Sequence, residues 1–191
     1  MKLRRWQQKV IDEFPEITKN YKKFILKAPT GAGKTVLASE IINRFYKNKK
    51  IVVLCHRLVL LEQLEKGLST DHKVKKLGLS EEGTPFENYD VLISTNLRSR
   101  DFLQNAIKHC DLLIIDEAHR VSPNGQAYKE LLDQFDKESA EQSKLLGLTA
   151  SPERRTGDQK DQLGLAFDAI IDCADIEELI KEGFLVPADY R

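Results

Sequence analysis

Short runs of aliphatic residues recur along this 191-residue chain, and each run is bordered by stretches with the spacing of a helix. The runs cover residues 24–26, 51–54, 91–93, 112–115 and 145–148. Each run is continuous rather than alternating with polar residues, which is typical of strands buried on both faces of a sheet. Strands that alternate with helices favour a parallel sheet with right-handed crossovers. The pattern therefore predicts one three-layer α/β domain, with a mostly parallel sheet and helices on both faces.

The segments between these runs carry apolar residues three and four positions apart, which predicts amphipathic helices. These helices are expected over residues 34–47, 61–68, 98–107 and 128–135. Weaker patterns predict a short extra strand over 73–77, a polar loop over 153–164, a last helix near 176–180 and a further strand in 184–191. Gly183 is expected to stop the last helix.

Composition narrows the class of protein. Hydrophobic residues make up 41% and charged residues 31% of the chain, which excludes collagen-like, low-complexity and disordered proteins. No apolar run approaches the roughly 18 residues of a membrane span, and the first residues lack an apolar signal core. Cys55, Cys110 and Cys173 lie far apart without a CxxC pair, so we expect reduced thiols in a cytoplasmic protein.

The net charge is zero, but its distribution is uneven. Residues 1–50 hold 13 Lys and Arg against 4 Asp and Glu, whereas residues 151–191 hold 5 against 10. The excess of positive charge in residues 1–50 could attract the phosphates of a nucleotide or of a nucleic acid. On charge alone, the simpler interpretation is that Lys47, Lys49 and Lys50 solvate a helix end, where cations suit the helix dipole.

The strongest chemical signal directly follows the first run and opens the first of these helices. It reads Ala28-Pro29-Thr30-Gly31-Ala32-Gly33-Lys34-Thr35. A glycine turn between a strand and a helix aims backbone N–H groups at one point, and the helix N-terminus adds its positive end. This pattern predicts an ATP site in which Lys34 reaches the β- and γ-phosphates and the Thr35 hydroxyl binds Mg²⁺. Ala28 departs from the stricter pattern, which has glycine there, and an ordinary strand-to-helix turn is the alternative.

A second signal, Asp116-Glu117-Ala118-His119, ends the run 112–115. Carboxyl ends of parallel strands meet at one edge of the sheet, so these acids are expected beside the glycine turn. Asp116 is then placed to hold Mg²⁺ from the side opposite Thr35, and Glu117 to accept a proton from the attacking water. By themselves, two acids after four aliphatic residues are equally consistent with ordinary strand termination.

With a glycine turn after one strand and an acidic pair after another, the chain resembles the first motor domain of superfamily 2 helicases and translocases. The sequence of residues 116–119 is that of the DEAH-box group. The resemblance implies a RecA-like P-loop NTPase domain that uses ATP and Mg²⁺, with Glu117 and Lys34 as catalytic residues. The segment 147–152 is similar to that family's third motif. This similarity implies that Thr149 and Ser151, with His119, couple the nucleotide state to the nucleic-acid site. From the residues alone, Thr149 and Ser151 are turn residues after a strand.

Three further segments resemble motifs of this family. The segment Leu3-Arg4-Arg5-Trp6-Gln7 is similar to the family's adenine-reading segment. The similarity implies that Gln7 reads the adenine, with Arg4 in support, and an amide can pair with an adenine edge as both donor and acceptor. A surface helix start is the competing interpretation, and Trp6 fits a packing anchor better than a cover for the base.

Residues 54–63 and 93–98 resemble segments that grip a nucleic-acid backbone, through Arg57 and Thr95. The alternatives are an ordinary surface cation at Arg57 and a helix N-cap at Thr95.

The resemblance also implies a partner and a second domain. Residues 153–158 partly match a subgroup acting on double-stranded DNA, which includes Rad25/XPB-like and restriction-translocase motors. DNA is therefore the expected partner, with RNA open and a nucleoid-associated location possible for the cytoplasmic protein. We expect an ATP-binding domain over 1–183, with 184–191 starting a linker to a second RecA-like domain supplied in cis or in trans.

Without that second domain, we expect weak ATP binding and very slow hydrolysis, since a missing arginine finger costs about 10³–10⁵ in rate. The alternatives are a nucleotide-gated nucleic-acid binding module that does not hydrolyse ATP, an RNA helicase, and a P-loop kinase or transport ATPase.

Overall fold

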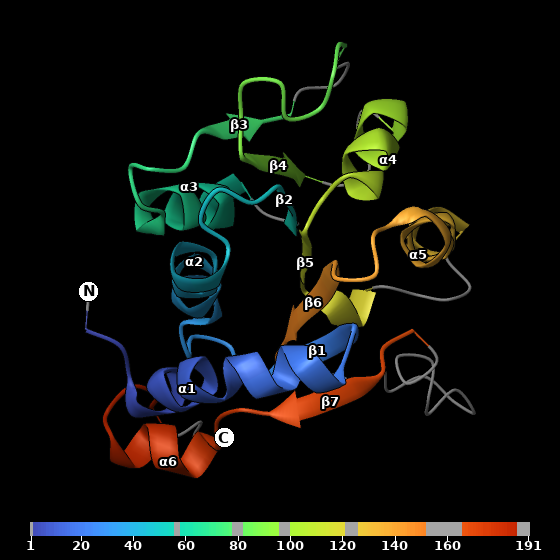
Figure 1. Ribbon diagram of the computed structural model, residues 1–191. Coiled ribbons are helices and arrows are strands. Elements are labelled where there is room, and N and C mark those ends of the chain that lie inside the picture. The colour runs from blue at the N-terminus through green and yellow to red at the C-terminus, as the bar shows by residue number, and fades with distance from the viewer. Residues whose placement is uncertain are drawn as a thin grey trace.

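A seven-stranded sheet forms the centre of the computed structural model (Figure 1), which describes residues 2–55, 58–77, 82–95, 100–120, 126–151 and 166–186. Its strands are β1 (Lys23–Lys27), β2 (Ile51–Cys55), β3 (Val74–Lys76), β4 (Val91–Thr95), β5 (Leu112–Asp116), β6 (Lys144–Thr149) and β7 (Ala169–Asp172). They lie in the order β3-β4-β2-β5-β6-β1-β7, and every neighbouring pair is parallel.

Helices cover both faces of this sheet (Figure 1). They are α1 (Arg5–Asn20), α2 (Lys34–Phe45), α3 (Leu58–Gly67), α4 (Arg100–Lys108), α5 (Gln126–Glu138) and α6 (Ile176–Lys181), with a 3₁₀ turn, η1 (Ala118–Arg120). The first three helices lie on one face and α4 and α5 on the other (Figure 1). The predicted three-layer α/β fold with a parallel sheet is thereby confirmed.

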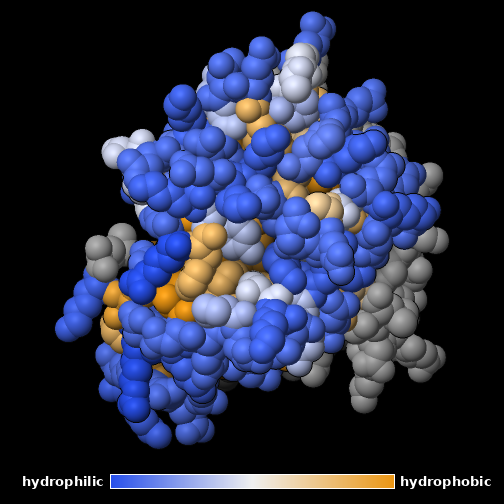
Figure 2. Space-filling model, viewed as in Figure 1, coloured by the Kyte–Doolittle hydropathy of each residue, from blue (hydrophilic) through white to orange (hydrophobic). Residues whose placement is uncertain are grey.

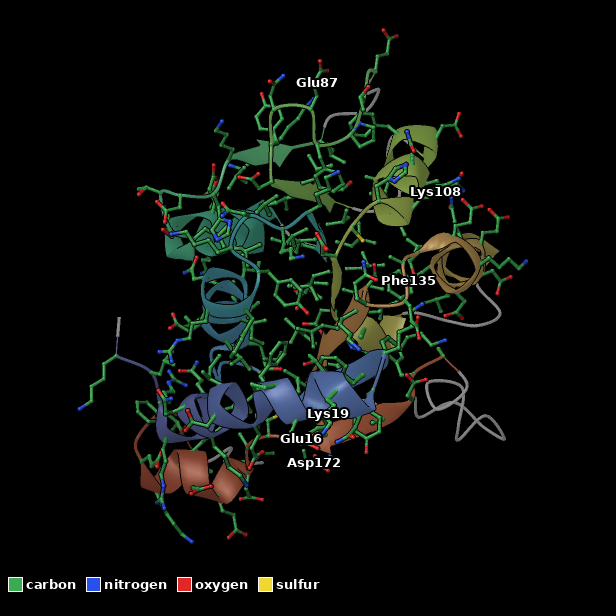
Figure 3. All side chains as sticks on the ribbon, viewed as in Figure 1. Glu16, Lys19, Glu87, Lys108, Phe135 and Asp172 are labelled. Atoms are coloured by element: carbon green, nitrogen blue, oxygen red, sulfur yellow. The ribbon has the colours of Figure 1, made fainter. Side chains whose placement is uncertain are left out.

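Strand β2 shows why the apolar runs are continuous. Its side chains are buried on both faces: Ile51 and Val53 belong to the core under α1–α3, whereas Val52 and Leu54 belong to the core under α4 and α5. Phe135 of α5 lies fully buried in this second core (Figure 3). Two separate cores on one sheet therefore require apolar residues at consecutive positions.

The outer surfaces of the helices are polar. Figure 3 shows Glu16 and Lys19 on the outward face of α1, where their side chains form an exposed ion pair of 3.8 Å. In Figure 2 most of the visible surface is hydrophilic, and much of its apolar area lies between α1 and α2. Among the described residues, no helix has both the length and the apolar character needed to cross a membrane.

The predicted positions of the central strands and of four helices are confirmed, as are the short strand β3 and the last helix α6. Helix α1, strand β7 and the 3₁₀ turn η1 were not predicted. Helix α1 was considered only as a helix start, although Trp6, Val10, Phe14 and Ile17 follow a helical spacing and are buried. Strand β7 has only four residues and lies at the sheet edge, so it lacks a continuous apolar run.

The expected strand over 184–191 is wrong in its described part. Gly183 adopts φ +75°, a left-handed conformation that suits glycine at the end of a helix. The backbone N–H groups of Phe184 and Leu185 then both donate to the carbonyl of Leu179, at 2.9 and 3.2 Å. The chain therefore turns back on α6 instead of extending. The remaining residues 187–191 and the predicted loop over 153–164 lie outside the described residues.

Candidate nucleotide-binding site

The glycine turn connects β1 to α2 and has the backbone of an anion-binding loop. Gly31 and Gly33 adopt φ values of +78° and +96°, which residues other than glycine rarely adopt. Gly33 is the N-cap of α2, so the loop ends at the helix N-terminus. Successive backbone N–H groups in such a turn form a nest for phosphate oxygens, which the helix dipole supports.

Lys34, the first residue of α2, lies at this turn. Its ammonium donates to the carbonyls of Ala28 and Pro29, at 2.9 and 3.1 Å. Burial lowers the pKa of Lys34, and the charges of Glu117 and Asp116 act in the opposite direction. The structure therefore brings the predicted lysine and both predicted acids into one electrostatic neighbourhood.

Asp116 ends β5 and lines a small cavity together with Thr35 of α2. The rest of that lining is mainly apolar and includes Cys55, whose pKa burial and the nearby Asp116 raise to about 12. Mg²⁺ binds through one or two protein oxygens and keeps several waters, with phosphate oxygens completing its shell. A threonine hydroxyl and one carboxylate beside a phosphate nest fit that donor set. Among the residues described, no cluster of three or more His, Cys, Asp and Glu forms an all-protein metal site.

Glu117 follows Asp116 at the start of a sharp turn. Its φ of +53° is unusual for a residue with a side chain and directs the chain into η1. One Glu117 carboxylate oxygen, Oε2, lies 3.2 Å from Nδ1 of His119, and that same nitrogen lies 3.0 Å from the Thr149 hydroxyl. His119 therefore joins the acidic pair to the end of β6.

Gly147 permits this close approach of η1 to β6. A Cβ at Gly147 would lie 2.9 Å from Cβ of Ala118 and 3.0 Å from Cγ1 of Ile25, which is too close for either neighbour. Thr149, two residues further along β6, is fully buried and accepts a hydrogen bond from the backbone N–H of Ser151 at 3.2 Å. The three predicted coupling residues thus form one continuous hydrogen-bonded chain that begins beside Glu117.

Arg4 and Gln7 lie against the glycine turn from the start of α1. Arg4 donates from Nη1 to the carbonyls of Gly31 and Ala32, at 3.2 and 2.7 Å. Gln7 donates from Nε2 to the carbonyl of Gly33 at 2.9 Å and accepts from the backbone N–H of Arg4 at 2.8 Å. Both side chains therefore brace the loop, and their predicted contact with the adenine stays a prediction. Trp6 is 5% exposed and belongs to the core, so its interpretation as a packing anchor is confirmed.

Comparisons with known proteins give the family of this chain. Residues 1–154 match the protein family described as "Type III restriction enzyme, res subunit". The chain belongs to this family. It is also similar to IRC3 of Saccharomyces cerevisiae, a protein whose name assigns it to the ATP-dependent helicases. The two are 30% identical over 202 aligned positions, which cover 98% of this chain but only 28% of IRC3.

Solved structures share the fold of this res-subunit family member. The UvsW helicase from bacteriophage T4 superposes with a TM-score of 0.65 at 16% identity, covering 90% of this chain and 60% of UvsW. The SWI2/SNF2 ATPase core of Sulfolobus solfataricus, solved in complex with double-stranded DNA, superposes with a TM-score of 0.60 at 17% identity. That match covers 80% of this chain and 32% of the other.

The structure describes one of the two predicted nucleic-acid-binding residues of this res-subunit domain. Thr95 ends β4, in register with Cys55 at the end of β2, so it lies at the same sheet edge as the candidate nucleotide site. Arg57 lies outside the described residues, as do residues 153–158, which carried the resemblance to the double-stranded DNA subgroup. Their contacts with nucleic acid stay predictions.

One neighbour of the loop was missed by sequence reasoning. The guanidinium carbon of Arg4 lies 4.1 Å from the centroid of the Phe184 ring, and Leu185 packs beside Gly31. These contacts join residues that are 180 and 154 positions apart, and no local pattern around 184–186 marks them.

Proposed function

We propose that this chain is the ATP-binding half of a superfamily 2 DNA helicase or translocase of the DEAH-box type, close to the Rad25/XPB-like and restriction-translocase subgroup. It would couple ATP hydrolysis to strand separation or movement along DNA, and would be largely inactive without a second RecA-like domain in cis or in trans. The observation that carries the proposal is the convergence of Lys34, Thr35, Asp116 and Glu117 at one sheet edge.

Each residue of this site has a chemical task in the proposal. Backbone N–H groups within residues 30–35 bind the phosphate oxygens. The Lys34 ammonium leaves the carbonyls of Ala28 and Pro29 to donate to the β- and γ-phosphates. Thr35 and Asp116 hold Mg²⁺, which when bound offsets the negative charge that develops on the phosphates. Glu117 orients the attacking water and accepts its proton.

DNA is the favoured partner for three reasons. The family includes restriction-enzyme subunits, one structural neighbour was solved on double-stranded DNA, and the first 50 residues carry a large excess of Lys and Arg. Arg57 and Thr95 are proposed to contact backbone phosphates, which grips the strand without reading its sequence. The chain formed by His119, Thr149 and Ser151 is proposed to connect those contacts with Glu117.

The first test measures ATP hydrolysis with single-stranded DNA, duplex DNA and RNA. We expect residues 1–191 alone to hydrolyse ATP very slowly. Together with any further domains that the gene encodes, the rate should rise by about 10³-fold or more, because an arginine finger contributes 10³–10⁵, and DNA should stimulate it more than RNA. Fast DNA-stimulated hydrolysis by 1–191 alone would contradict the two-domain part of the proposal. DNA binding without any hydrolysis in the longer protein would favour the non-hydrolysing module.

A second test concerns coupling. Thr149→Val removes the hydroxyl that lies 3.0 Å from His119 and keeps the size of the side chain. We expect ATP affinity to stay within about twofold and the stimulation of hydrolysis by DNA to fall about tenfold, the cost of roughly one buried hydrogen bond. Thr18→Val on α1, whose hydroxyl bonds only within its own helix turn in the described contacts, is the matched control. Equal stimulation in both variants would remove Thr149 from this role.

A further inference from the structure

A small cavity lies beside β3 and β4, far from the candidate nucleotide site. Residues 82–89, which precede β4, line it from outside, and the buried side chains of Leu92 on β4 and Phe102 on α4 form its floor. β3 and β4 make up one side of the sheet, whereas β1, which leads into the phosphate loop, lies toward the other (Figure 1). The cavity therefore shares no residue with the nucleotide site.

Three aromatic rings line this cavity, and each already lies against a positive charge of this chain. The Lys75 ammonium is 5.6 Å from the ring centroids of both Tyr89 and Phe102. The Lys50 ammonium is 5.9 Å from the ring centroid of Phe86. Cations within about 6 Å of a ring centroid are attracted by the negative face of the ring. Tyr89 is also 38% exposed, so a cation from outside can reach its ring.

The backbone fixes one of these rings independently of any ligand. Phe86 adopts φ +65°, which is strained for a large side chain and persists only where the surrounding structure holds it. Its side chain packs against the core under α4 and α5. This wall of the cavity is therefore preformed.

Two carboxylates add negative charge at the mouth of the cavity. Glu82 and Glu87 line it and are exposed to solvent, and Glu87 can be followed in Figure 3. Aromatic faces beside carboxylates suit a guanidinium group, which stacks flat on a ring and donates two parallel hydrogen bonds to a carboxylate. Because one water needs about 10–15 Å³, a cavity of about 80 Å³ has room for the few atoms of a guanidinium.

We infer that this cavity is a docking site for a partner protein that presents an arginine side chain. The guanidinium stacks on Tyr89, pairs with the carboxylates at the mouth and displaces the Lys75 ammonium from the rings. Lys75 is then the resident occupant of the site and competes with the partner. Removing its ammonium should therefore tighten binding of the guanidinium, whereas a lysine that only supported the loop would weaken binding when removed.

The test compares two capped tripeptides, Gly-Arg-Gly and Gly-citrulline-Gly, which differ in the positive charge of one side chain. Binding to the 191-residue chain is followed by chemical-shift changes of its backbone amides, and a single-stranded oligonucleotide is titrated in parallel. We expect the arginine peptide to shift amides of residues 82–90 with a millimolar dissociation constant. The citrulline peptide should bind about threefold more weakly or worse, the loss of one cation–π contact.

Variants then assign the effect to the cavity. Tyr89→Leu should weaken binding of the arginine peptide about threefold, and Tyr89→Phe should retain it. Tyr21→Leu is the matched control, because Tyr21 is 37% exposed and lies just before β1. Lys75→Met should tighten binding about threefold, since it removes the competing ammonium. Lys73→Met makes the same change of charge at a residue that does not line the cavity, and should have a smaller effect.

Each other result overturns the proposal. Equal binding of both peptides shows that the charge is not recognised, and unchanged binding by Tyr89→Leu shows that the ring is not used. Weaker binding by Lys75→Met shows that the lysine supports the loop instead of occupying the site. If only the oligonucleotide shifts residues 82–90, the surface binds nucleic acid and not an arginine side chain. Thermal unfolding checks each fold, and the Lys75 variant decides if Tyr89→Leu does not fold.

Discussion

Glu117→Gln is expected to keep ATP binding and to lower turnover about 10³-fold or more, within the usual range for loss of a general base. The amide has the shape of the carboxylate but accepts no proton from the attacking water. Its oxygen can still accept a hydrogen bond from Nδ1 of His119, so the 3.2 Å contact and the turn at φ +53° are preserved. The loss should therefore appear in the chemical step and not in folding or in the dissociation constant for MgATP.

The measurement is single-turnover hydrolysis with DNA present, in the protein together with any domains encoded beyond residue 191. Binding of MgATP is measured in parallel, and thermal unfolding checks the fold. Glu87→Gln is the matched control, since it makes the same chemical change on an exposed loop far from the site (Figure 3). Turnover within tenfold of wild type would show that another group accepts the proton. Loss of ATP binding would show that Glu117 supports the phosphates instead.

The sequence predicts the central strands, the phosphate loop and the acidic pair for a common physical reason. Residues such as Val52 and Val53 are both buried because the sheet is covered on both faces, so a continuous apolar run is a reliable sign of a central strand. The phosphate loop and the acidic pair are contiguous motifs at the ends of such strands. The carboxyl ends of parallel strands lie at one edge of the sheet. The parallel arrangement alone therefore predicts that Lys34 and Asp116 lie near each other.

What the sequence did not predict depends on contacts between distant segments. The family resemblance implies Arg4 and Gln7 for the nucleotide site, but not their hydrogen bonds to backbone carbonyls of the loop, because carbonyls carry no residue-specific signal. Phe184 reaches the site only because Gly183 reverses the chain, a turn that looks like the start of a strand when 184–191 is considered alone. Gly147 is explained by neighbours that are distant in sequence, since it leaves space for Ala118 of η1 and for Ile25 of β1.

Lys34→Ala is expected to weaken MgATP binding about 100-fold, because it removes charge-assisted hydrogen bonds to two phosphates, each contributing roughly 1.5–3 kcal/mol. The fold should tolerate the change. In the free protein the ammonium donates only to loop carbonyls in the described contacts, and burial of its charge opposes the gain from those bonds. Thermal unfolding of the variant should therefore stay close to that of the wild type, and Lys19→Ala on the exposed face of α1 should change neither property.

The dependence on pH separates this role from a merely structural one. Burial lowers the pKa of Lys34, so its positive charge is lost at a lower pH than that of an ordinary lysine. MgATP affinity of the wild type should then decline as the pH rises into the alkaline range, and the affinity of Lys34→Ala should lack that decline. If both proteins show the same decline, a different group titrates and Lys34 is not the phosphate partner. If only the wild type shows it, the charge of Lys34 itself binds the nucleotide.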